Sequence, residues 1–157
     1  MAYYTRIPSS VGEITLMSYD GARLGGLWLD TQVPQISDGQ RTDDAEIFVN
    51  TGQWLERYFA GEAPSAERIP LDLRGTDFQR LVWRELCRIP YGTTVSYGEL
   101  AHRIGCRSAQ AVGQAVGKNP VSVIVPCHRV IGKNGALTGY AGGLEKKREL
   151  LKIEGIL

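Results

Sequence analysis

Two short helical segments separated by a three-residue turn form the most restrictive pattern in this chain. The first begins at the capping box Ser96-Tyr97-Gly98-Glu99, in which the serine and glutamate side chains satisfy free backbone N–H groups reciprocally. It ends at Gly105, because glycine accepts the left-handed conformation that closes a helix. The second begins at Ser108 and stops before Asn119-Pro120. Two short helices joined by a turn that contains glycine predict a helix-turn-helix.

The second helix of this pair is thin, because small residues occupy most of its positions. One interpretation is close packing against a neighbouring helix of the same protein. The other is insertion into a DNA groove, since the minor groove is only about 6 Å wide. The sequence leaves both interpretations open. The small residues are Ala109, Ala111, Gly113, Ala115 and Gly117.

The first half of the chain predicts a small sheet followed by a helix. Stretches rich in β-prone residues alternate with turn-prone ones, and an amphipathic segment then follows. The predicted strands lie in Thr5–Met17 and Leu24–Leu29, a loop covers Thr31–Thr42, a helix capped by Asp43 or Asp44 runs to about Ala60, and Glu62–Arg74 is a linker.

The second half predicts helices, a buried strand and a hairpin. The Asn134-Gly135 pair is a strong hairpin-turn signal, so we expect Val130–Tyr140 to form a β-wing beside the helix-turn-helix. The other predicted elements are a helix from Thr76 or Asp77 to Pro90, a strand at Val121–Val125, and a helix at Leu144–Glu154 capped by Gly155. We therefore predict an α+β protein, with a small sheet-and-helix domain at 1–70 and a winged-helix-like domain with a helix-turn-helix at 71–157.

The net charge of +1 hides an asymmetry between the two halves. Residues 1–75 carry six arginines, no lysine and eleven acids, whereas residues 76–157 carry twelve lysines and arginines and six acids. Between Glu99 and Glu145 the chain has no acid at all. A basic stretch without acids indicates a surface that faces a polyanion such as DNA, although chance clustering on a solvated face gives the same pattern.

Composition excludes several protein classes. With 43% hydrophobic and 22% charged residues, the chain is globular rather than disordered. Apolar runs such as Val121–Pro126 are far shorter than the roughly 20 residues that span a bilayer. The N-terminus lacks the basic-then-apolar pattern of a signal peptide, and the three cysteines lie in no paired motif. We expect a reduced, cytoplasmic protein with no membrane partner.

The residues that carry chemistry lie in Pro126-Cys127-His128-Arg129-Val130. A cysteine beside a histidine and an arginine lies in positive potential, which favours the nucleophilic thiolate. A histidine that acts as a base needs a partner, usually a carboxylate, and the downstream acids are Glu145, Glu149 and Glu154. Because adjacent side chains cannot easily share a linear hydrogen bond, we expect a bridging water. Taken alone, the pair also fits a buried cysteine with incidental neighbours.

Together with the segments around it, this stretch resembles the O6-alkylguanine-DNA alkyltransferases, also called methylated-DNA–protein-cysteine methyltransferases. The resemblance covers Thr76 to Gly155 and extends more loosely over the N-terminal part. The Pro-Cys-His-Arg-Val signature, with Asn-Pro upstream and Tyr and Gly-Gly downstream, is highly specific. The matching segments are Phe78-Gln79, Val82-Trp83, Pro90-Tyr91-Gly92, Ser96-Tyr97, Ala111-Val112-Gly113, Gly117-Lys118-Asn119-Pro120, Ile124 to Ile131, Gly139-Tyr140, Gly142-Gly143-Leu144, Leu150-Leu151 and Glu154-Gly155.

The resemblance implies direct reversal of DNA damage in a single turnover, without a cofactor. Cys127 would displace the alkyl group from O6 of guanine and keep it as a thioether. His128 would deprotonate Cys127 through a water, and Glu154 would orient His128. Such proteins flip the base out of the duplex, because the target atom is inaccessible in the stack. The implied partner is double-stranded DNA that carries O6-alkylguanine, with methyl as the alkyl group and O4-methylthymine as a secondary substrate, bound by a monomer.

Further site residues follow from the same resemblance. Asn119 resembles the hinge asparagine that ties the turns around the site, and Tyr97 resembles the tyrosine that rotates the target phosphate and donates a proton toward N3 of guanine. The substrate pocket would comprise the Val130 carbonyl, which reads the exocyclic amine, and Tyr140, Ala141 and Gly142. The DNA-binding residues would be Ala109, Gln110, Ala111, Gly113, Arg107, Lys118, Arg129 and Lys133. The N-terminal domain would be ribonuclease-H-like.

Plainer interpretations of single residues also remain. Tyr97 fits a tyrosine that packs at a helix start, Asn119 fits an ordinary helix stop, and Glu154 fits a solvated acid in the last helical turn. The joint spacing of these residues around Cys127 favours the functional interpretation.

The chain departs from the family pattern at two positions. Gln110 stands where the family usually has an arginine, the finger that fills the gap left by the flipped base. Its amide is shorter and uncharged, although it still forms hydrogen bonds. Ala141 replaces a common serine, and a backbone N–H there still serves O6. We expect no metal, because no cysteine or histidine precedes Cys87 and the pair His102 and Cys106 supplies only two ligands.

Two rival functions use the same residues. One is a damage-recognition protein that binds alkylated DNA without transfer; Cys127 argues against it, whereas Gln110 keeps it open. The other is a thiol hydrolase with Cys127, His128 and Glu154, which would turn over with water.

Overall fold

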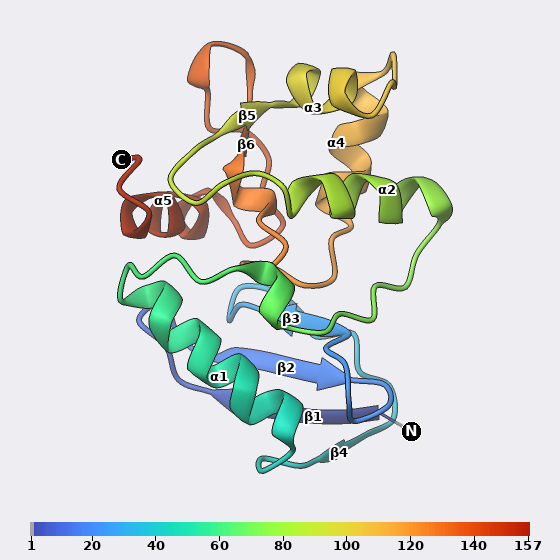
Figure 1. Cartoon of the computed structure of the whole chain (residues 1–157), viewed down its shortest axis with the longest axis vertical. Helices are drawn as coiled ribbons and strands as arrows, with labels where there is room; N and C mark the ends of the chain where they lie inside the picture. The colour runs from blue at the N-terminus through green and yellow to red at the C-terminus, as the bar shows by residue number, and fades with distance from the viewer. Residues whose placement is uncertain (1) are drawn as a thin grey trace.

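The computed structural model describes residues 2–157 and places the two halves of the chain one above the other along the longest axis (Figure 1). The N-terminal half is a sheet of order β3-β2-β1-β4 with α1 lying across it. Strand β1 pairs antiparallel with β2 and parallel with β4, and β2 pairs antiparallel with β3. The elements are β1 Ala2–Ile7, β2 Ile14–Ser18, β3 Gly26–Trp28, β4 Gly39–Arg41, α1 Glu46–Phe59 and the 3-10 turn η1 Ala66–Arg68.

The N-terminal half differs from the sequence prediction at three places. The β-prone stretch Thr5–Met17 is two strands rather than one, because the Ser9 hydroxyl donates to the Gly12 carbonyl and closes a turn between them. The predicted loop Thr31–Thr42 contains the short strand β4. Neither aspartate caps α1, since Asp43 instead accepts hydrogen bonds from Thr5 and Arg41, which belong to β1 and β4.

The C-terminal half confirms the predicted helix-turn-helix. Ser96 and Glu99 form the expected capping box at the start of α3, and Gly105 follows with φ of 69°. The Ser108 side chain accepts from the Ala111 backbone N–H at 3.0 Å and begins α4. The elements are α2 Asp77–Leu86, β5 Val95–Ser96, α3 Tyr97–Arg103, α4 Ala109–Gly117, the 3-10 turn η2 Cys127–Arg129, β6 Val130–Ile131, the 3-10 turn η3 Lys133–Gly135 and α5 Leu144–Ile153.

Two predictions about β-structure in this half are wrong. The buried run Val121–Val125 is a series of turns, and Val123 has a φ of 72° that no strand contains. The wing has the expected turn at Asn134 and Gly135, but within the described residues only one arm is a strand, β6, which pairs parallel with β5. The second arm is missing because the Gly132 N–H donates to the Ala136 carbonyl and closes a tight loop instead. The α+β class with a helix-turn-helix is otherwise as predicted.

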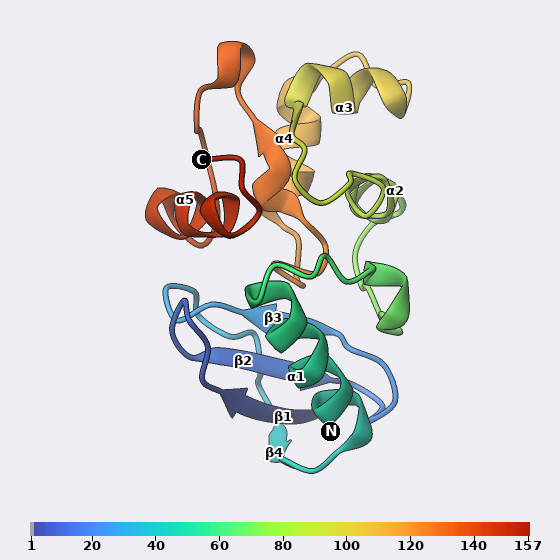
Figure 2. The ribbon, with the colours of Figure 1, turned by 60° about the vertical axis from the view of Figure 1, so that its left-hand side comes forward.

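The two halves are joined through backbone contacts at the edge of β3. The Leu27 N–H donates to the Pro120 carbonyl at 3.0 Å, and the Ser122 N–H donates back to the Leu27 carbonyl at 3.2 Å. The turns before Cys127 therefore continue the sheet edge, between the sheet and the C-terminal helices (Figure 2). No helix among residues 2–157 is long and apolar enough to cross a membrane.

Candidate active site

Asn119 holds the loop that carries the cysteine. Its side-chain amide donates to the Val125 carbonyl at 2.9 Å and to the Val121 carbonyl at 3.4 Å, while its side-chain oxygen accepts from the Val121 N–H at 3.0 Å. One buried side chain thus closes a loop whose backbone pairs with the sheet only at Leu27 among the described residues. This arrangement agrees with the predicted hinge and explains why the run is not a strand.

The Cys127 thiol begins the turn η2 and is buried, at 5% exposure. Burial raises the pKa of this thiol, and the Asn119 side chain, the Lys147 charge and the Tyr140 side chain only partly oppose that effect. Positive charge does act on the thiol in the expected direction, but it comes from Lys147 and burial outweighs it, so a resting thiolate is not favoured. The cause is desolvation, which disfavours the charged form. A protonated nucleophile needs a base.

A buried carboxylate fixes the orientation of the His128 imidazole. Its Nε2 lies 2.5 Å from Glu154 Oε2, at the end of α5, and both side chains are fully buried. Its Nδ1 is buried and has no hydrogen-bond partner among residues 2–157. Burial lowers the pKa of His128, and the interaction with Glu154 works against that shift. The neutral imidazole therefore has one nitrogen tied to a carboxylate and the other free to accept a proton.

Glu154 is ionised in this environment. Although burial works in the opposite direction, hydrogen bonds from His128, Arg129 and the Gly92 N–H hold the pKa of Glu154 at about 2. Arg129 Nε lies 2.7 Å from Glu154 Oε1, and another guanidinium nitrogen donates to the Ile89 carbonyl at 2.7 Å. The interpretation of Glu154 as a solvated acid is thus excluded.

Arg129 is not on the DNA-facing surface. The sequence placed it among the DNA-binding residues, but its side chain is only 9% exposed and its charge is paired with Glu154. A guanidinium whose N–H groups already donate to acceptors inside the protein is poorly placed to bind a DNA phosphate. We reassign Arg129 to the support of Glu154.

Lys147 is a buried cation that the sequence prediction missed. Its Nζ donates to the Val130 carbonyl at 2.5 Å and to the Thr138 carbonyl at 3.0 Å, and burial lowers its pKa to about 8. It therefore ties β6 to the loop after it, next to Cys127. The sequence did contain a signal for this buried lysine, because Lys147 lies on the same helical face as Leu150 and Leu151. A charged side chain rarely faces a core unless it has a partner there.

The predicted substrate-pocket residues lie along one loop. The Tyr140 hydroxyl is buried without a hydrogen bond of ordinary geometry among residues 2–157, and the Gly142 carbonyl accepts from Thr31 of the N-terminal half at 2.6 Å. A cavity of about 670 Å³ is lined by Tyr140, Ala141 and Gly142.

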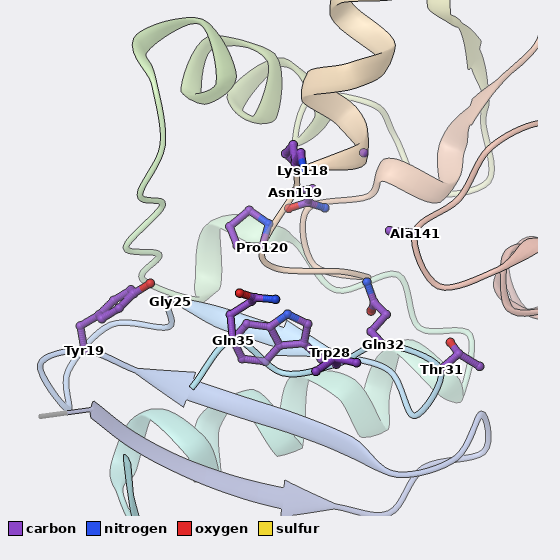
Figure 3. A pocket seen from close by; sticks show the side chains of 12 residues that line it. Tyr19, Gly25, Trp28, Thr31, Gln32, Gln35, Lys118, Asn119, Pro120 and Ala141 are labelled. Carbon is purple, nitrogen blue, oxygen red and sulfur yellow. The ribbon is translucent and has the colours of Figure 1, made fainter. Parts of the chain in front are cut away.

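A second cavity, of about 600 Å³, shares Thr31 and Ala141 with the first and lies between the two halves. Figure 3 shows Trp28, Gln32 and Gln35 on its N-terminal wall, and Lys118, Asn119 and Ala141 opposite them. Cys127 lines neither cavity. The buried thiol therefore opens into neither of these two cavities.

Comparison with known proteins identifies the family. Two sequence profiles match, the ribonuclease-like domain of 6-O-methylguanine DNA methyltransferase over residues 2–73 and its DNA binding domain over residues 77–156. The chain belongs to the 6-O-methylguanine DNA methyltransferase family.

Individual relatives agree with this family over nearly the whole chain. The methylated-DNA–protein-cysteine methyltransferase of Mycobacterium tuberculosis (strain ATCC 25618 / H37Rv) is 48% identical over 155 residues, with 98% of this chain and 93% of the relative covered. That of Haemophilus influenzae is 43% identical, with 98% and 87% covered. The crystal structure of Mycobacterium tuberculosis OGT in complex with DNA superposes with a TM-score of 0.89 at 46% identity, over 97% of this chain and 92% of that one.

Membership of the methyltransferase family confirms the resemblance seen in the sequence. Alkyl transfer to a protein cysteine, in direct reversal of DNA damage, is the activity of this chain. Neither the binding-only protein nor the thiol hydrolase is favoured, since these relatives carry the name of the transferase. Among residues 2–157 no three histidine, cysteine, aspartate or glutamate side chains gather into a candidate metal site.

In this methyltransferase α4 divides into a packed face and an exposed face. Val112, Ala115 and Val116 are buried, and Trp83 of α2 donates to the Ala115 carbonyl at 2.8 Å, as the close-packing interpretation expects. Ala109 and Gln110 are exposed at the start of the helix. The close-packing interpretation is therefore confirmed for one face, and insertion of the exposed face into a DNA groove stays a prediction.

The exposed end of the methyltransferase carries Tyr97 and most of the remaining predicted residues, whereas Lys118 lies at the other end of α4 and lines the cavity between the two halves. Tyr97 lies beside α4, and its hydroxyl donates to the Gly139 carbonyl at 3.3 Å and to the Thr138 carbonyl at 3.4 Å. Both views place α3 and the loop around 132–139 at the end of the molecule that is far from the sheet (Figures 1 and 2). The exposed cations of the acid-free stretch are Arg103, Arg107, Lys118 and Lys133, and the two predicted DNA-binding residues that are half-buried are Ala111 and Gly113.

Proposed function

We propose that this chain binds double-stranded DNA that carries O6-alkylguanine, flips the damaged base out of the duplex and moves the alkyl group to Cys127 once per molecule. The observation that carries the assignment of roles is the buried network Cys127, His128 and Glu154, with Glu154 2.5 Å from His128 and 2.7 Å from Arg129. Methyl is the expected group, and O4-methylthymine is a secondary substrate.

The reaction is an in-line displacement in which bonds and protons balance. The Cys127 proton passes through a water to Nδ1 of His128, and the sulfur then attacks the alkyl carbon. A sulfur–carbon bond forms as the carbon–O6 bond breaks, and the electron pair leaves with guanine, which takes a proton from Tyr97. The proton held by His128 is then released to water and Tyr97 regains one from water, so the net change is one proton moved from Cys127 to guanine. Glu154 stabilises the protonated imidazole. The product thioether has no route to hydrolysis, so turnover stops after one event.

The residues around the thiol fit recognition of a flipped guanine. The Val130 carbonyl has a second lone pair besides the one used by Lys147, and that lone pair accepts from the exocyclic amine of guanine. Tyr140, Ala141 and Gly142 form the wall between the thiol and the outside. Tyr97 stands at the entrance, and burial raises its pKa, so it remains a proton donor toward N3 at neutral pH.

We propose a DNA surface made of the exposed start of α4 and the cations around it. Phosphates contribute most of the affinity of such surfaces and are bound by arginine and lysine. Gln110 at the start of α4 fills the gap left by the flipped base. The proposed residues around this start are Ala109, Gln110, Ala111, Gly113, Arg107 and Lys133, with Arg103 added and Arg129 removed. Lys118 also stays in the proposal, as a separate contact at the other end of α4. The protein acts as a monomer in the cytoplasm, with domains at 1–70 and 71–157.

Intact-mass measurement after incubation with an O6-methylguanine oligonucleotide tests the proposal. We expect a gain of about 14 mass units, located on Cys127, in a one-to-one stoichiometry with repaired guanine. Cys127→Ala abolishes the gain and retains DNA binding, whereas the control Cys87→Ala keeps the gain. Methylation of the Cys127→Ala protein would overturn the nucleophile, repeated turnover would indicate a hydrolase, and binding without any mass gain would indicate a damage-recognition protein.

A further inference from the structure

One side chain of the N-terminal half reaches the catalytic network. Tyr58 lies in the last turn of α1 and is fully buried. Its ring stacks on Trp54, with centroids 5.7 Å apart, and meets Phe59 and Tyr91 edge-on at 5.3 Å and 5.9 Å. Three aromatic neighbours therefore fix the direction of the hydroxyl group.

The Tyr58 hydroxyl contacts two members of the network. It donates to Glu154 Oε2 at 2.6 Å and lies 3.2 Å from His128 Nε2. Glu154 consequently has four donors: Tyr58 and His128 on Oε2, and Arg129 and the Gly92 N–H on Oε1. A buried carboxylate with both oxygens doubly occupied has no alternative rotamer that keeps its bonds.

These contacts decide which nitrogen of His128 carries the proton. Nε2 faces an ionised carboxylate, which only accepts, and a phenol oxygen whose hydrogen already points to Glu154. A neutral imidazole in this position must hold its hydrogen on Nε2, which leaves the lone pair on the buried, unpartnered Nδ1. That is the tautomer that a base for the adjacent thiol requires.

We propose that Tyr58 is a positioning residue of the alkyl-transfer reaction, holding Glu154 and the Nε2–H tautomer of His128 from the N-terminal half. The inference rests on the proposed function, because it assigns His128 the role of base. Tyr58 touches neither the thiol nor the substrate pocket and acts only through its two partners. The N-terminal half thus completes the catalytic site as well as supporting it.

The charged and titratable groups around His128 and Glu154 do not change the role of Tyr58 as a hydrogen-bond donor near neutral pH. His128 and Glu154 face Arg129 of η2, Lys147 of α5 and Tyr91 of the loop before β5, besides Cys127 itself. Burial and Glu154 raise the pKa of Tyr58 far above its usual value, so the phenol keeps its hydrogen. Tyr58 is therefore a constant donor and does not titrate with the reaction.

Nitrogen NMR of labelled histidine reads the tautomer directly, since the chain has only two histidines and the second, His102, is exposed and serves as a reference. We expect a protonated Nε2 and an unprotonated Nδ1 for His128 in the parent protein at neutral pH. Tyr58→Phe keeps the ring, shifts both His128 resonances toward a mixture of tautomers, and slows transfer by about 10-fold, part of the roughly 10²- to 10⁴-fold that a general base contributes.

Tyr91→Phe is the matched control, because its ring packs on Tyr58 and its hydroxyl donates to the Ile153 carbonyl, outside the network. It leaves the His128 resonances and the rate unchanged. In a Glu154→Gln background, Tyr58→Phe has little further effect on the rate, since the partner through which it acts is altered.

Several outcomes overturn the proposal. An Nδ1–H tautomer of His128 in the parent protein would overturn it without any variant. A Tyr58→Phe protein with unchanged His128 resonances and an unchanged transfer rate would also overturn it. Equal shifts in Tyr91→Phe and Tyr58→Phe would show general loosening instead of positioning. If Glu154→Gln alone leaves the rate intact, the proposed role of Glu154 in the reaction fails; if Glu154→Gln slows transfer and Tyr58→Phe does not, only the role of Tyr58 fails.

Discussion

The Tyr58 hydroxyl and the Glu154 carboxylate, 96 positions apart in the chain, form a hydrogen bond of 2.6 Å. It joins the last turn of the N-terminal helix to the end of the C-terminal one, and His128 lies against both groups. The Glu154 carboxylate is therefore held by both halves of the protein, and its charge, orientation and pKa depend on how the halves pack.

Removing the charge of Glu154 weakens the base. In Glu154→Gln the protonated form of His128 loses its stabilising anion, so the apparent pKa of the Cys127 thiol rises and alkyl transfer slows by about 10²-fold. The check is the pH dependence of Cys127 alkylation by iodoacetamide, followed by mass. Glu149→Gln, on the same helix and outside the network, is the control and keeps the parent profile. Identical profiles for parent and Glu154→Gln would contradict the prediction.

Acid destabilises the fold through the same carboxylate. The pKa of Glu154 is about 2 in the folded protein and near its ordinary value of 4.5 in the unfolded chain. A carboxyl with a lower pKa in the folded state contributes stability that is fully present above the unfolded pKa and is lost as the pH falls toward the folded one. The Tm of the parent should therefore fall more steeply between about pH 5 and about pH 3 than the Tm of Glu154→Gln. Parallel Tm curves for the two proteins would argue against an ionised Glu154.

Asn119 stabilises the loop that presents the nucleophile. Asn119→Ala removes its bonds to the Val121 N–H, the Val121 carbonyl and the Val125 carbonyl, and leaves buried backbone groups without partners. Each buried group left unsatisfied costs about 1–3 kcal/mol, so the free energy of unfolding falls by at least that much, and transfer slows as Cys127 shifts. Urea denaturation measures the loss. Asn50→Ala, at an exposed position of α1, is the control, and an equal effect there would contradict the assignment.

We expect Gln110 to limit base flipping. Unstacking and unpairing a base costs a few kcal/mol, and an inserted guanidinium, which stacks and carries charge, offsets more of that cost than an amide does. Gln110→Arg should speed repair of O6-methylguanine in duplex DNA and leave the reaction with free O6-benzylguanine unchanged, since a free base needs no flipping. Both rates are measured in both proteins at one salt concentration.

The control for this substitution is Gln114→Arg, one helical turn further along α4 and also exposed. It adds the same charge at a different place. If both rates rise together in Gln110→Arg, the position acts on the thiol pocket; if Gln114→Arg accelerates duplex repair equally, the gain comes from charge alone.

Local sequence signals predicted the helices whose ends are capped by residues within or next to the helix itself. The capping box at Ser96 and Glu99, the cap at Ser108 and the glycine after α3 all appear in the structure as expected. Each involves hydrogen bonds between residues three or four apart, so the sequence contains both partners. The aspartate cap of α1 failed for the opposite reason, since Asp43 bonds to Thr5, which is 38 positions away.

The sequence by itself determined the family signature around Cys127 and His128 and the helix-turn-helix, because these depend on residue types at short, fixed spacing. Only the tertiary structure decided the turns at Val121–Val125, the inward side chain of Arg129, the lysine beside the thiol and the place of Tyr58. All four depend on desolvation and on partners distant in the chain. Burial shifts an ionisable group toward its neutral form, and the sequence does not show which buried groups contact one another in the fold.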